Sequence, residues 1–315
     1  MSNSRLHALD IPALLRQYGL RPSKGLGQNF LQDEQALQKI VEIADIQQDD
    51  TVLEIGPGLG GLTRHLARRA AQVIAVELDE DLFAPLQAIL APYPNVQLIH
   101  GDILKLQPSE LVAASNYLVV ANIPYYITSA LLRHLLAQPV TEKSTPKNQQ
   151  SAISNPQSAI SNPQSAISNP QSAILNPQSA PRPRRLVLTV QEGVAERICA
   201  APGELSLLAL SVQVYGKPVI AARIPAAAFY PAPNVNSAVV AIDVYAQSII
   251  PYPRLETFFR LAKAGFGQKR KTLRNALSAI MPRDKAEQLL LSAGIDPMRR
   301  AETLSLHEWA KLSEP

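Results

Sequence analysis

Cysteine is almost absent from this chain, and long apolar runs are absent altogether. The 315 residues contain one cysteine, Cys199, so an intrachain disulfide framework is excluded and a reducing compartment is favoured. No stretch reaches the roughly 18 uninterrupted apolar residues that a membrane-spanning helix needs. The first residues, MSNSRLHALD, lack an apolar run of signal-peptide type. We therefore expect a cytoplasmic protein with no membrane partner.

Clusters with metal-ligand spacing are lacking as well. His65, His100 and His134 are scattered, and no group of His, Cys and Asp has the spacing of a metal site. Cys199 lies in a helical pattern and is expected in the core rather than as a nucleophile. We expect no metal.

Positive charge is concentrated near the C-terminus. The formal net charge is +4, yet residues 249–315 hold 12 Lys and Arg against 7 Asp and Glu, whereas the rest holds 18 against 19. A local basic excess is a usual footprint of a phosphate-backbone partner, although a solvated helical surface explains it about as well. The candidate RNA-binding residues form its densest part: Lys269, Arg270, Lys271 and Arg274.

Short strand-like runs alternate with helical patterns between residues 51 and 244. Strands alternating with helices predict an α/β fold with a parallel, doubly wound sheet. The last two runs are separated by a loop without a helix, so we expect the final strand to be antiparallel. The seven runs are 51–55, 72–77, 96–100, 116–121, 184–190, 218–224 and 237–244.

A tandem repeat interrupts the sheet pattern. Residues 151–178 are four heptads, SAISNPQ three times and then SAILNPQ. Each copy carries a proline that would break a helix, and the composition buries too little apolar area to fold alone. We expect a disordered insertion over 141–183, attached at the edge of the sheet opposite the ligand-binding edge.

Beyond about Pro251 the pattern is purely helical. We therefore expect a larger α/β domain over 1–248, which includes the insertion. Residues 249–315 are expected to form a small all-helical domain that binds RNA.

A glycine-rich run follows the first strand of the predicted sheet. The sequence from Glu54 to Gly61 fits G-x-G-x-x-G, with Glu77 about 20 residues further on at the end of the second strand. Such glycines let the backbone turn and approach a ligand closely, and the acid can bind ribose hydroxyls. Alone, the run indicates a nucleotide-type cofactor, and a NAD-dependent dehydrogenase fits it almost as well as a methyltransferase.

Asp102 and Ile103 follow the third strand. The carboxylate can accept a hydrogen bond from an adenine amino group, and Ile103 can lie on the adenine face. The alternative is that Asp102 is an ordinary turn or capping residue.

The fourth strand ends in Asn122-Ile123-Pro124-Tyr125. The exocyclic N6 of adenine is a poor nucleophile because its lone pair is delocalised, and it carries two N–H donors. The side-chain oxygen of Asn122 and the backbone carbonyl of Pro124 supply two acceptors, and Tyr125 offers a face for an extruded base. Such stacking is worth about 1–3 kcal/mol, comparable to the cost of flipping a base.

Further motifs complete the pattern. They are 27–31 (GQNFL), 76–79 (VELD), 191–197 (QEGVAER), 229–240 (FYPAPNVNSAVV) and 264–277 (AGFGQKRKTLRNAL). With these motifs the chain resembles the ribosomal RNA adenine dimethyltransferases, and among them the KsgA/RsmA small-subunit family. The resemblance covers nearly the whole chain except the repeat insertion.

The resemblance implies a class I methyltransferase fold: a Rossmann-like, seven-stranded, mostly parallel sheet with a small helical C-terminal domain. It implies S-adenosylmethionine as the cofactor. It also implies the substrate: two adjacent adenosines in the 3′-terminal hairpin loop of small-subunit (16S) rRNA, dimethylated at N6 in the assembling 30S subunit. We expect a monomer.

The resemblance also implies roles for individual residues. Phe229 is expected to face Tyr125 across the target base. The candidate catalytic residues are thus Asn122, Pro124, Tyr125 and Phe229. The candidate cofactor contacts are Asn29, Leu31, Gly56, Gly58, Glu77, Asp102, Ile103 and Asn122.

Three alternatives stay open at this point. The first is a large-subunit rRNA adenine methyltransferase of the antibiotic-resistance type, which shares the Asn-Ile-Pro-Tyr motif. The second is an assembly factor that binds RNA without catalysis, and the third is a dehydrogenase. The wording of the motifs after the fifth strand favours the small-subunit enzyme.

Overall fold

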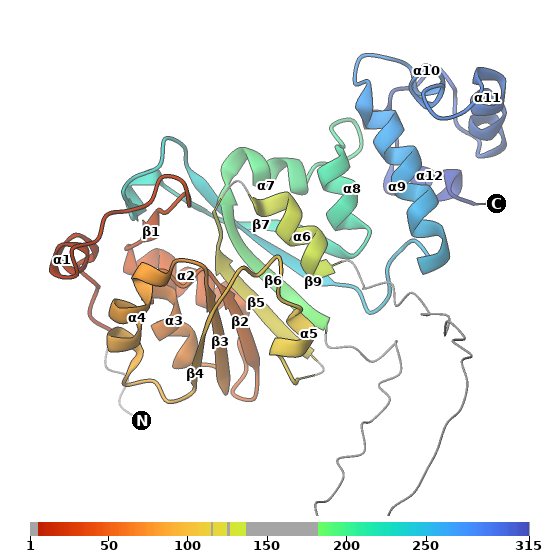
Figure 1. Ribbon diagram of the computed structural model, residues 1–315. Helices are drawn as coiled ribbons and strands as arrows, with labels where there is room; N and C mark the ends of the chain where they lie inside the picture. The colour runs from red at the N-terminus through yellow and green to blue at the C-terminus, as the bar shows by residue number, and fades with distance from the viewer. Residues whose placement is uncertain (1–5, 115, 125–126, 137–181, 315) are drawn as a thin grey trace, which may run out of the picture. The chain divides into compact units, whose positions relative to one another are not determined.

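The computed structural model describes residues 6–114, 116–124, 127–136 and 182–314, and its main feature is a seven-stranded sheet (Figure 1). The strand order is β4-β3-β2-β5-β6-β9-β7. The strands of this sheet are β2 (Thr51–Ile55), β3 (Gln72–Glu77), β4 (Val96–His100), β5 (Asn116–Asn122), β6 (Arg182–Gln191), β7 (Gly216–Ile224) and β9 (Ser237–Val244).

The strand directions confirm the predicted fold class. The four pairings among β2 to β6 are parallel, whereas β9 is antiparallel to both β6 and β7. The final strand is therefore antiparallel, as the missing helix between the last two runs predicts. The sequence pattern also gives the bounds of β2, β3, β4 and β9 without error.

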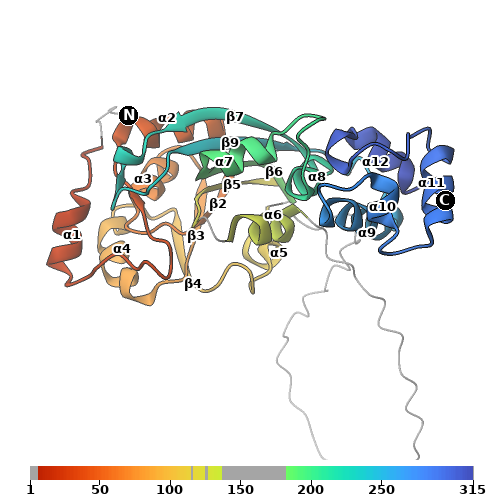
Figure 2. The ribbon, with the colours of Figure 1, turned by 90° about the horizontal axis from the view of Figure 1, so that it is seen from above.

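Alternation along the strands sends side chains to two separate apolar clusters, one on each face of the sheet. On β2, Val52 joins a cluster with Leu37 of helix α2 (Glu34–Ala44), whereas the next residue, Leu53, joins a cluster with Leu132 of helix α6 (Thr128–Leu136). Figure 2 shows α2 and α6 on opposite sides of the strands. The helices up to β9 are α1 (Ile11–Gln17), α2 (Glu34–Ala44), α3 (Gly61–Ala67), α4 (Phe83–Leu90), α5 (Pro108–Leu111), α6 (Thr128–Leu136), α7 (Glu192–Ile198) and α8 (Leu207–Gln213).

Two short strands outside the main sheet were not expected from the sequence. β1 (Phe30–Leu31) and β8 (Phe229–Tyr230) form an antiparallel pair that joins the N-terminal segment to the segment before β9. Ala228 extends this junction, because its carbonyl accepts from the backbone N–H of Gln32 at 2.9 Å. A strand of two residues has no hydrophobic period, so only the tertiary structure reveals it.

The repeats themselves lie outside the described residues. The expected insertion, 141–183, is wrong at its last two residues, because Arg182 and Pro183 belong to β6 and pair with β5. β6 begins at Arg182, which pairs with Asn116 at the start of β5. The chain therefore enters β6 at the amino ends of the parallel strands, the edge that the sequence predicts for this connection.

The residues after β9 are helical, as predicted. The helices are α9 (Tyr252–Gly267), α10 (Leu273–Leu277), α11 (Arg283–Ser292) and α12 (Leu306–Leu312). Their side chains, including Phe258 and Trp309, belong to the same contiguous apolar cluster as Leu186 of β6. Gly265 lets α9 approach Trp309 closely, because a Cβ at this position would lie 2.7 Å from the indole ring. The expected boundary between 248 and 249 stays a prediction, since one core runs across it.

Candidate active site

A cavity of about 240 Å³ opens at the carboxyl ends of the parallel strands, where doubly wound sheets bind their ligands. Its walls come from the glycine-rich loop after β2, the ends of β3 and β5, the turn after β4 and the N-terminal segment. The cavity brings together all of the expected cofactor contacts: Asn29, Leu31, Gly56, Gly58, Glu77, Asp102, Ile103 and Asn122.

The glycine-rich loop owes its path to backbone conformations that other residues rarely adopt. Gly58 has a φ of +60°, and a Cβ on it would lie only 3.0 Å from the ring of Phe30. Its backbone N–H donates to Oε2 of Glu77 at 2.9 Å. Gly58 therefore lets the loop pass between Phe30 and the end of β3.

Glu77 lines the cavity, and three backbone hydrogen bonds hold its carboxylate in place. Oε1 accepts from the backbone N–H groups of Leu78 at 2.9 Å and Asp79 at 3.0 Å, while Oε2 accepts from Gly58. Burial raises the pKa of Glu77, and these three hydrogen bonds oppose that rise. A carboxylate has about four acceptor sites, so Oε2 keeps room for a ribose hydroxyl.

Glu54 is a second acid in the cavity wall, and it is not among the residues expected to contact the cofactor. Its side chain is only 1% exposed, and Oε2 has no hydrogen-bond partner within the described residues. Burial raises the pKa of Glu54 to about 8, and the nearby charge of Glu77 adds to the rise. Its position in an otherwise apolar strand, TVLEI, was the available signal.

Asp102 forms the hydrogen bond expected of a turn residue. Its Oδ1 accepts from the backbone N–H of Leu104 at 3.0 Å, and its Oδ2 lies 3.8 Å from Nζ of Lys105. The side chain nevertheless lines the cavity together with Ile103, which is buried. The turn therefore holds the carboxylate in place without using up its acceptor sites.

The side chain of Asn122 is oriented by the N-terminal segment. Its Nδ2 donates to the backbone carbonyl of Asn29 at 3.1 Å, and the Asn29 side chain in turn donates to the carbonyl of Gly27. The described part of the chain gives Oδ1 of Asn122 no hydrogen-bond partner. Asn122 lines the cavity, and its oxygen is the amide atom that the contact with Asn29 leaves for other donors.

Pro124 lines the cavity next to Asn122. Its carbonyl accepts from the backbone N–H of Ile127 at 3.2 Å, which leaves one of its two lone pairs. Tyr125, the expected stacking residue, lies outside the described residues.

Phe229 is not exposed to the cavity. Its side chain is 2% exposed and packs in the cluster that contains Leu31 and Val239. Its expected position opposite Tyr125 across a base therefore stays a prediction, and stacking there would require Phe229 to leave this cluster.

The N-terminal segment is tied down by polar contacts at both ends. Gln28 donates to Oδ2 of Asp79 at 2.5 Å and accepts from the backbone N–H of Ser23 at 2.7 Å. Arg64 of α3 donates to the carbonyl of His7 at 2.8 Å. No sequence pattern marks the contacts of Gln28 with Asp79 and of Arg64 with His7, because they join residues 51 and 57 positions apart in the chain.

The four candidate RNA-binding residues fall into two groups. Lys269, Arg270 and Lys271 are exposed in the segment between α9 and α10. Arg274, by contrast, is an internal brace: its guanidinium donates to Glu287 of α11 at 3.0 Å, and only 19% of the side chain is exposed. The structure therefore separates Arg274 from the three exposed cations.

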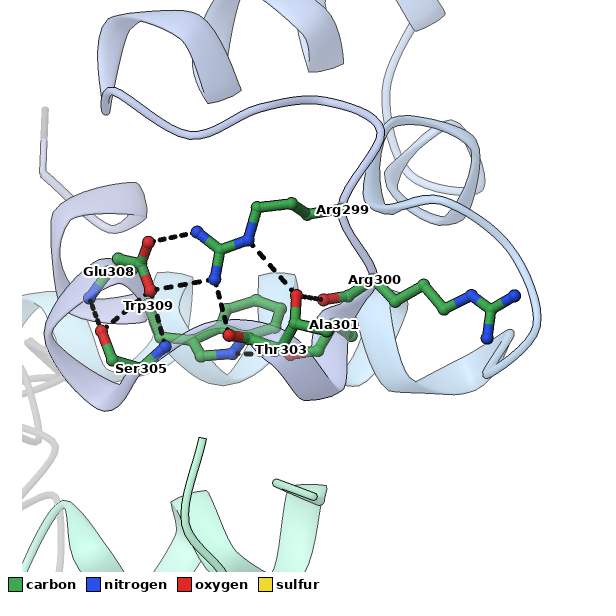
Figure 3. Close-up of polar contacts among 7 residues, drawn as sticks. All are labelled: Arg299, Arg300, Ala301, Thr303, Ser305, Glu308 and Trp309. Carbon is green, nitrogen blue, oxygen red and sulfur yellow. Dashed lines mark hydrogen bonds and ion pairs between the residues drawn. The ribbon is translucent and has the colours of Figure 1, made fainter. Parts of the chain in front are cut away.

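A polar network ties the segment before α12 to that helix (Figure 3). Arg299 forms an ion pair with Glu308, and its backbone carbonyl accepts from the N–H of Leu273 at 2.7 Å. Glu308 also closes a capping box with Ser305, and the contact with Arg299 lowers the pKa of Glu308 to about 2. In Figure 3 the guanidinium of Arg300 points away from this network, which adds another exposed cation to the helical part.

The charge of the cavity wall discriminates between cofactors. Among the described residues that line the cavity there are three acids, Glu54, Glu77 and Asp102, and no Lys, Arg or His. S-adenosylmethionine carries a sulfonium, an ammonium and a carboxylate group, so it brings a net positive charge to these acids. A dinucleotide would bring two phosphate charges to the same acids. The residues present therefore fit S-adenosylmethionine.

Comparisons with known proteins identify the family of this chain. Residues 20–314 match the family model "Ribosomal RNA adenine dimethylase". A relative from Dehalococcoides mccartyi (strain CBDB1), "Ribosomal RNA small subunit methyltransferase A", is 43% identical over 302 residues, 95% of this chain and 90% of the relative. Its namesake from Moorella thermoacetica is 38% identical over 313 residues, 96% and 94% of the two chains.

Two solved structures share the fold. The 23S rRNA methyltransferase ErmE gives a TM-score of 0.64 at 24% identity, over 90% of this chain and 98% of that one. A dimethyladenosine transferase from Plasmodium falciparum gives 0.67 at 22% identity, over 90% and 95%. With the match over residues 20–314, these findings show that the chain belongs to the ribosomal RNA adenine dimethylase family.

Proposed function

We propose that this protein dimethylates N6 of two adjacent adenosines in the 3′-terminal hairpin loop of small-subunit (16S) rRNA, with S-adenosylmethionine as the methyl donor. Membership of the family and the names of relatives with up to 43% identity support this proposal. It acts on the assembling 30S subunit, in the cytoplasm, as a monomer without a metal ion. Within the described residues, no helix is long and apolar enough to cross a membrane.

The observation that carries the proposal is the orientation of the Asn122 amide. Because its nitrogen is engaged by the carbonyl of Asn29, its oxygen is the atom available to a substrate. That oxygen accepts one N–H of the adenine amine, and the carbonyl of Pro124 accepts the other. Two acceptors favour a pyramidal nitrogen with a localised lone pair, which is the form that reacts, so they act mainly in the transition state.

When bound, S-adenosylmethionine supplies an electrophilic methyl group. Glu77 accepts from the ribose hydroxyls, Asp102 accepts from the adenine amine, and Ile103 packs on the adenine face. The remaining cofactor contacts are Asn29, Leu31, Gly56, Gly58 and Asn122. Of these residues, Glu77 and Asp102 keep acceptor sites beyond their internal hydrogen bonds.

Tyr125 and Phe229 are proposed to hold the extruded base, with the rearrangement of Phe229 described above. Residues 1–248 are proposed as the methyltransferase domain and residues 249–315 as the helical RNA-binding domain. Within the latter, Lys269, Arg270 and Lys271 contact phosphate groups. Arg274 contributes by bracing the segment that carries them.

The direct test is transfer of labelled methyl groups from S-adenosylmethionine to unmethylated small subunits, followed by nucleoside analysis. We expect N6,N6-dimethyladenosine in the small subunit and no label in large subunits treated in parallel. Label in the large subunit alone would favour the large-subunit alternative. Binding to small subunits without any transfer would favour a non-catalytic assembly factor.

A further inference from the structure

The two-stranded sheet formed by β1 and β8 has two faces with different surroundings. Phe30 lies opposite Tyr230, and Leu31 lies opposite Phe229. Directly opposite residues of an antiparallel pair share a face, with Cβ atoms about 4.5–5.5 Å apart. Leu31 and Phe229 are buried together in the cluster beneath the sheet. The other face therefore carries Phe30 and Tyr230.

Tyr230 is the exposed aromatic residue of this pair. Phe30 is 7% exposed, lines the cavity and lies against Gly58, whereas Tyr230 is 36% exposed. Among the described residues, the other large aromatic side chain of comparable exposure is Tyr252 of α9, at 40%. Tyr230 thus presents an accessible ring beside a residue of the cavity wall.

The segment after Tyr230 lies at the same edge of the sheet as Asn122. It leads to Ser237, which pairs with Gln191 at the carboxyl end of β6, and Asn122 pairs with Thr189 of the same strand.

The end of this segment is held in place by Asn236. Its side-chain Oδ1 accepts from the backbone N–H of Ala226 at 3.1 Å, and its carbonyl accepts from the N–H of Glu192 at 3.0 Å. The backbone of Tyr230 is paired with β1 at the other end. The exposed ring is therefore attached to a braced backbone rather than to a free loop.

We propose that Tyr230 stacks on an unpaired base next to the target adenosine and so positions the RNA strand at the mouth of the cavity. This inference rests on the proposed function. Flipping the target base exposes the face of its neighbour, and proteins commonly cover such faces with aromatic rings. Phe229 cannot do so without leaving its buried cluster, whereas Tyr230 needs no rearrangement.

The test compares kcat and KM on unmethylated small subunits for the wild type, Tyr230→Ala, Tyr230→Phe and Tyr230→Trp. Tyr252→Ala is the control, since Tyr252 of α9 is similarly exposed but, unlike Tyr230, is not paired with a residue of the cavity wall. We expect Tyr230→Ala to raise KM by about tenfold, with kcat and cofactor affinity little changed. The Phe and Trp variants keep the wild-type KM because they keep a stacking face.

A second measurement reads stacking directly. A hairpin RNA with 2-aminopurine next to the target adenosine loses fluorescence when the base stacks on a ring. We expect the wild type and Tyr230→Phe to quench it and a folded Tyr230→Ala protein not to. Unchanged KM and quenching in Tyr230→Ala would overturn the inference, and so would a KM in Tyr230→Phe raised as far as in Tyr230→Ala. A wild type that quenches but transfers no methyl would instead contradict the proposed function.

Discussion

The side-chain nitrogen of Asn122 lies 3.1 Å from the backbone carbonyl oxygen of Asn29, to which it donates a hydrogen bond. This contact joins the end of β5 to the N-terminal segment, 93 positions away in the chain. Because the nitrogen of the amide is engaged in this contact, the oxygen of the amide is the atom left to bind a substrate. The N-terminal segment is therefore part of the active site through its backbone.

Asn122→Ala is expected to lower kcat by about a hundredfold or more, the usual effect of removing one transition-state hydrogen bond. The matched control is Asn116→Ala, an exposed asparagine at the opposite end of the same strand. Methyl transfer to small subunits measures both. Equal turnover by the two folded variants would mean that the Asn122 amide does not hold the adenine amine.

Asn122→Asp tests the orientation as well as the acceptor. Aspartate keeps the acceptor oxygen but replaces the NH2 group with a second oxygen, which would face the carbonyl of Asn29 at about the present distance. The resulting repulsion should rotate the side chain and lower kcat, although an acceptor remains. Wild-type turnover in this variant would show that the contact with Asn29 does not set the geometry.

Glu77→Ala is expected to weaken S-adenosylmethionine binding by tenfold or more while RNA binding is retained. The change removes an acceptor for the ribose and leaves three backbone N–H groups without their partner, each at a cost of about 1–3 kcal/mol when buried. Calorimetric titration with the cofactor measures the loss. Glu80→Ala, an exposed acid just beyond, is the control and should bind normally.

The central strands β2, β3 and β5 could be predicted because buried parallel strands leave continuous apolar runs between turn residues. The grouping of the expected cofactor contacts could be predicted as well, because parallel strands end at one edge of the sheet. The glycine-rich loop and the ends of β3, β4 and β5 therefore line one cavity. The contacts that orient the site could not be predicted, since Asn122 and Asn29, or Gln28 and Asp79, meet only in the folded chain.

Burial was the second property that the sequence did not reveal. Phe229 stands in a motif that suggests an exposed ring, yet the pairing with β1 turns it inward and leaves Tyr230 exposed. Arg274 stands in a basic run, yet the first turn of α10 directs it to Glu287. A one-dimensional pattern cannot distinguish these neighbours, because side-chain direction changes with each residue.

The different roles of Arg274 and of the three exposed cations can be tested by separate substitutions. Changing Lys269, Arg270 and Lys271 together to Ala should weaken binding to small subunits and flatten its salt dependence by about two units of log–log slope. Arg274→Ala should instead lower the melting temperature, because it breaks the ion pair with Glu287. Binding titrations at several salt concentrations and a melting curve measure the two effects. A triple variant with the wild-type slope would identify the three cations as a solvated surface.

Glu54 gives the site a predictable dependence on pH. Burial raises its pKa from an ordinary value of 4.5 to about 8, so between these values the unfolded chain ionises the group while the folded chain keeps it protonated. The unfolded state then binds fewer protons, and the free energy of unfolding contributed by this group falls as pH rises from about 4.5 to 8. Glu54→Gln should remove that fall, so the variant should match the wild type near pH 5 and exceed its stability near pH 8.

Urea unfolding of the cofactor-free protein at several pH values measures the difference, with Glu42→Gln as an exposed control. Bound S-adenosylmethionine should oppose this fall in the free energy of unfolding with rising pH, because positive charge near Glu54 favours the ionised carboxylate. Cofactor binding near pH 7 should therefore release a proton from the wild type and none from Glu54→Gln. Calorimetry in buffers of different ionisation enthalpy detects that proton. Parallel stability curves together with equal proton release would show that Glu54 does not face the cationic part of the cofactor.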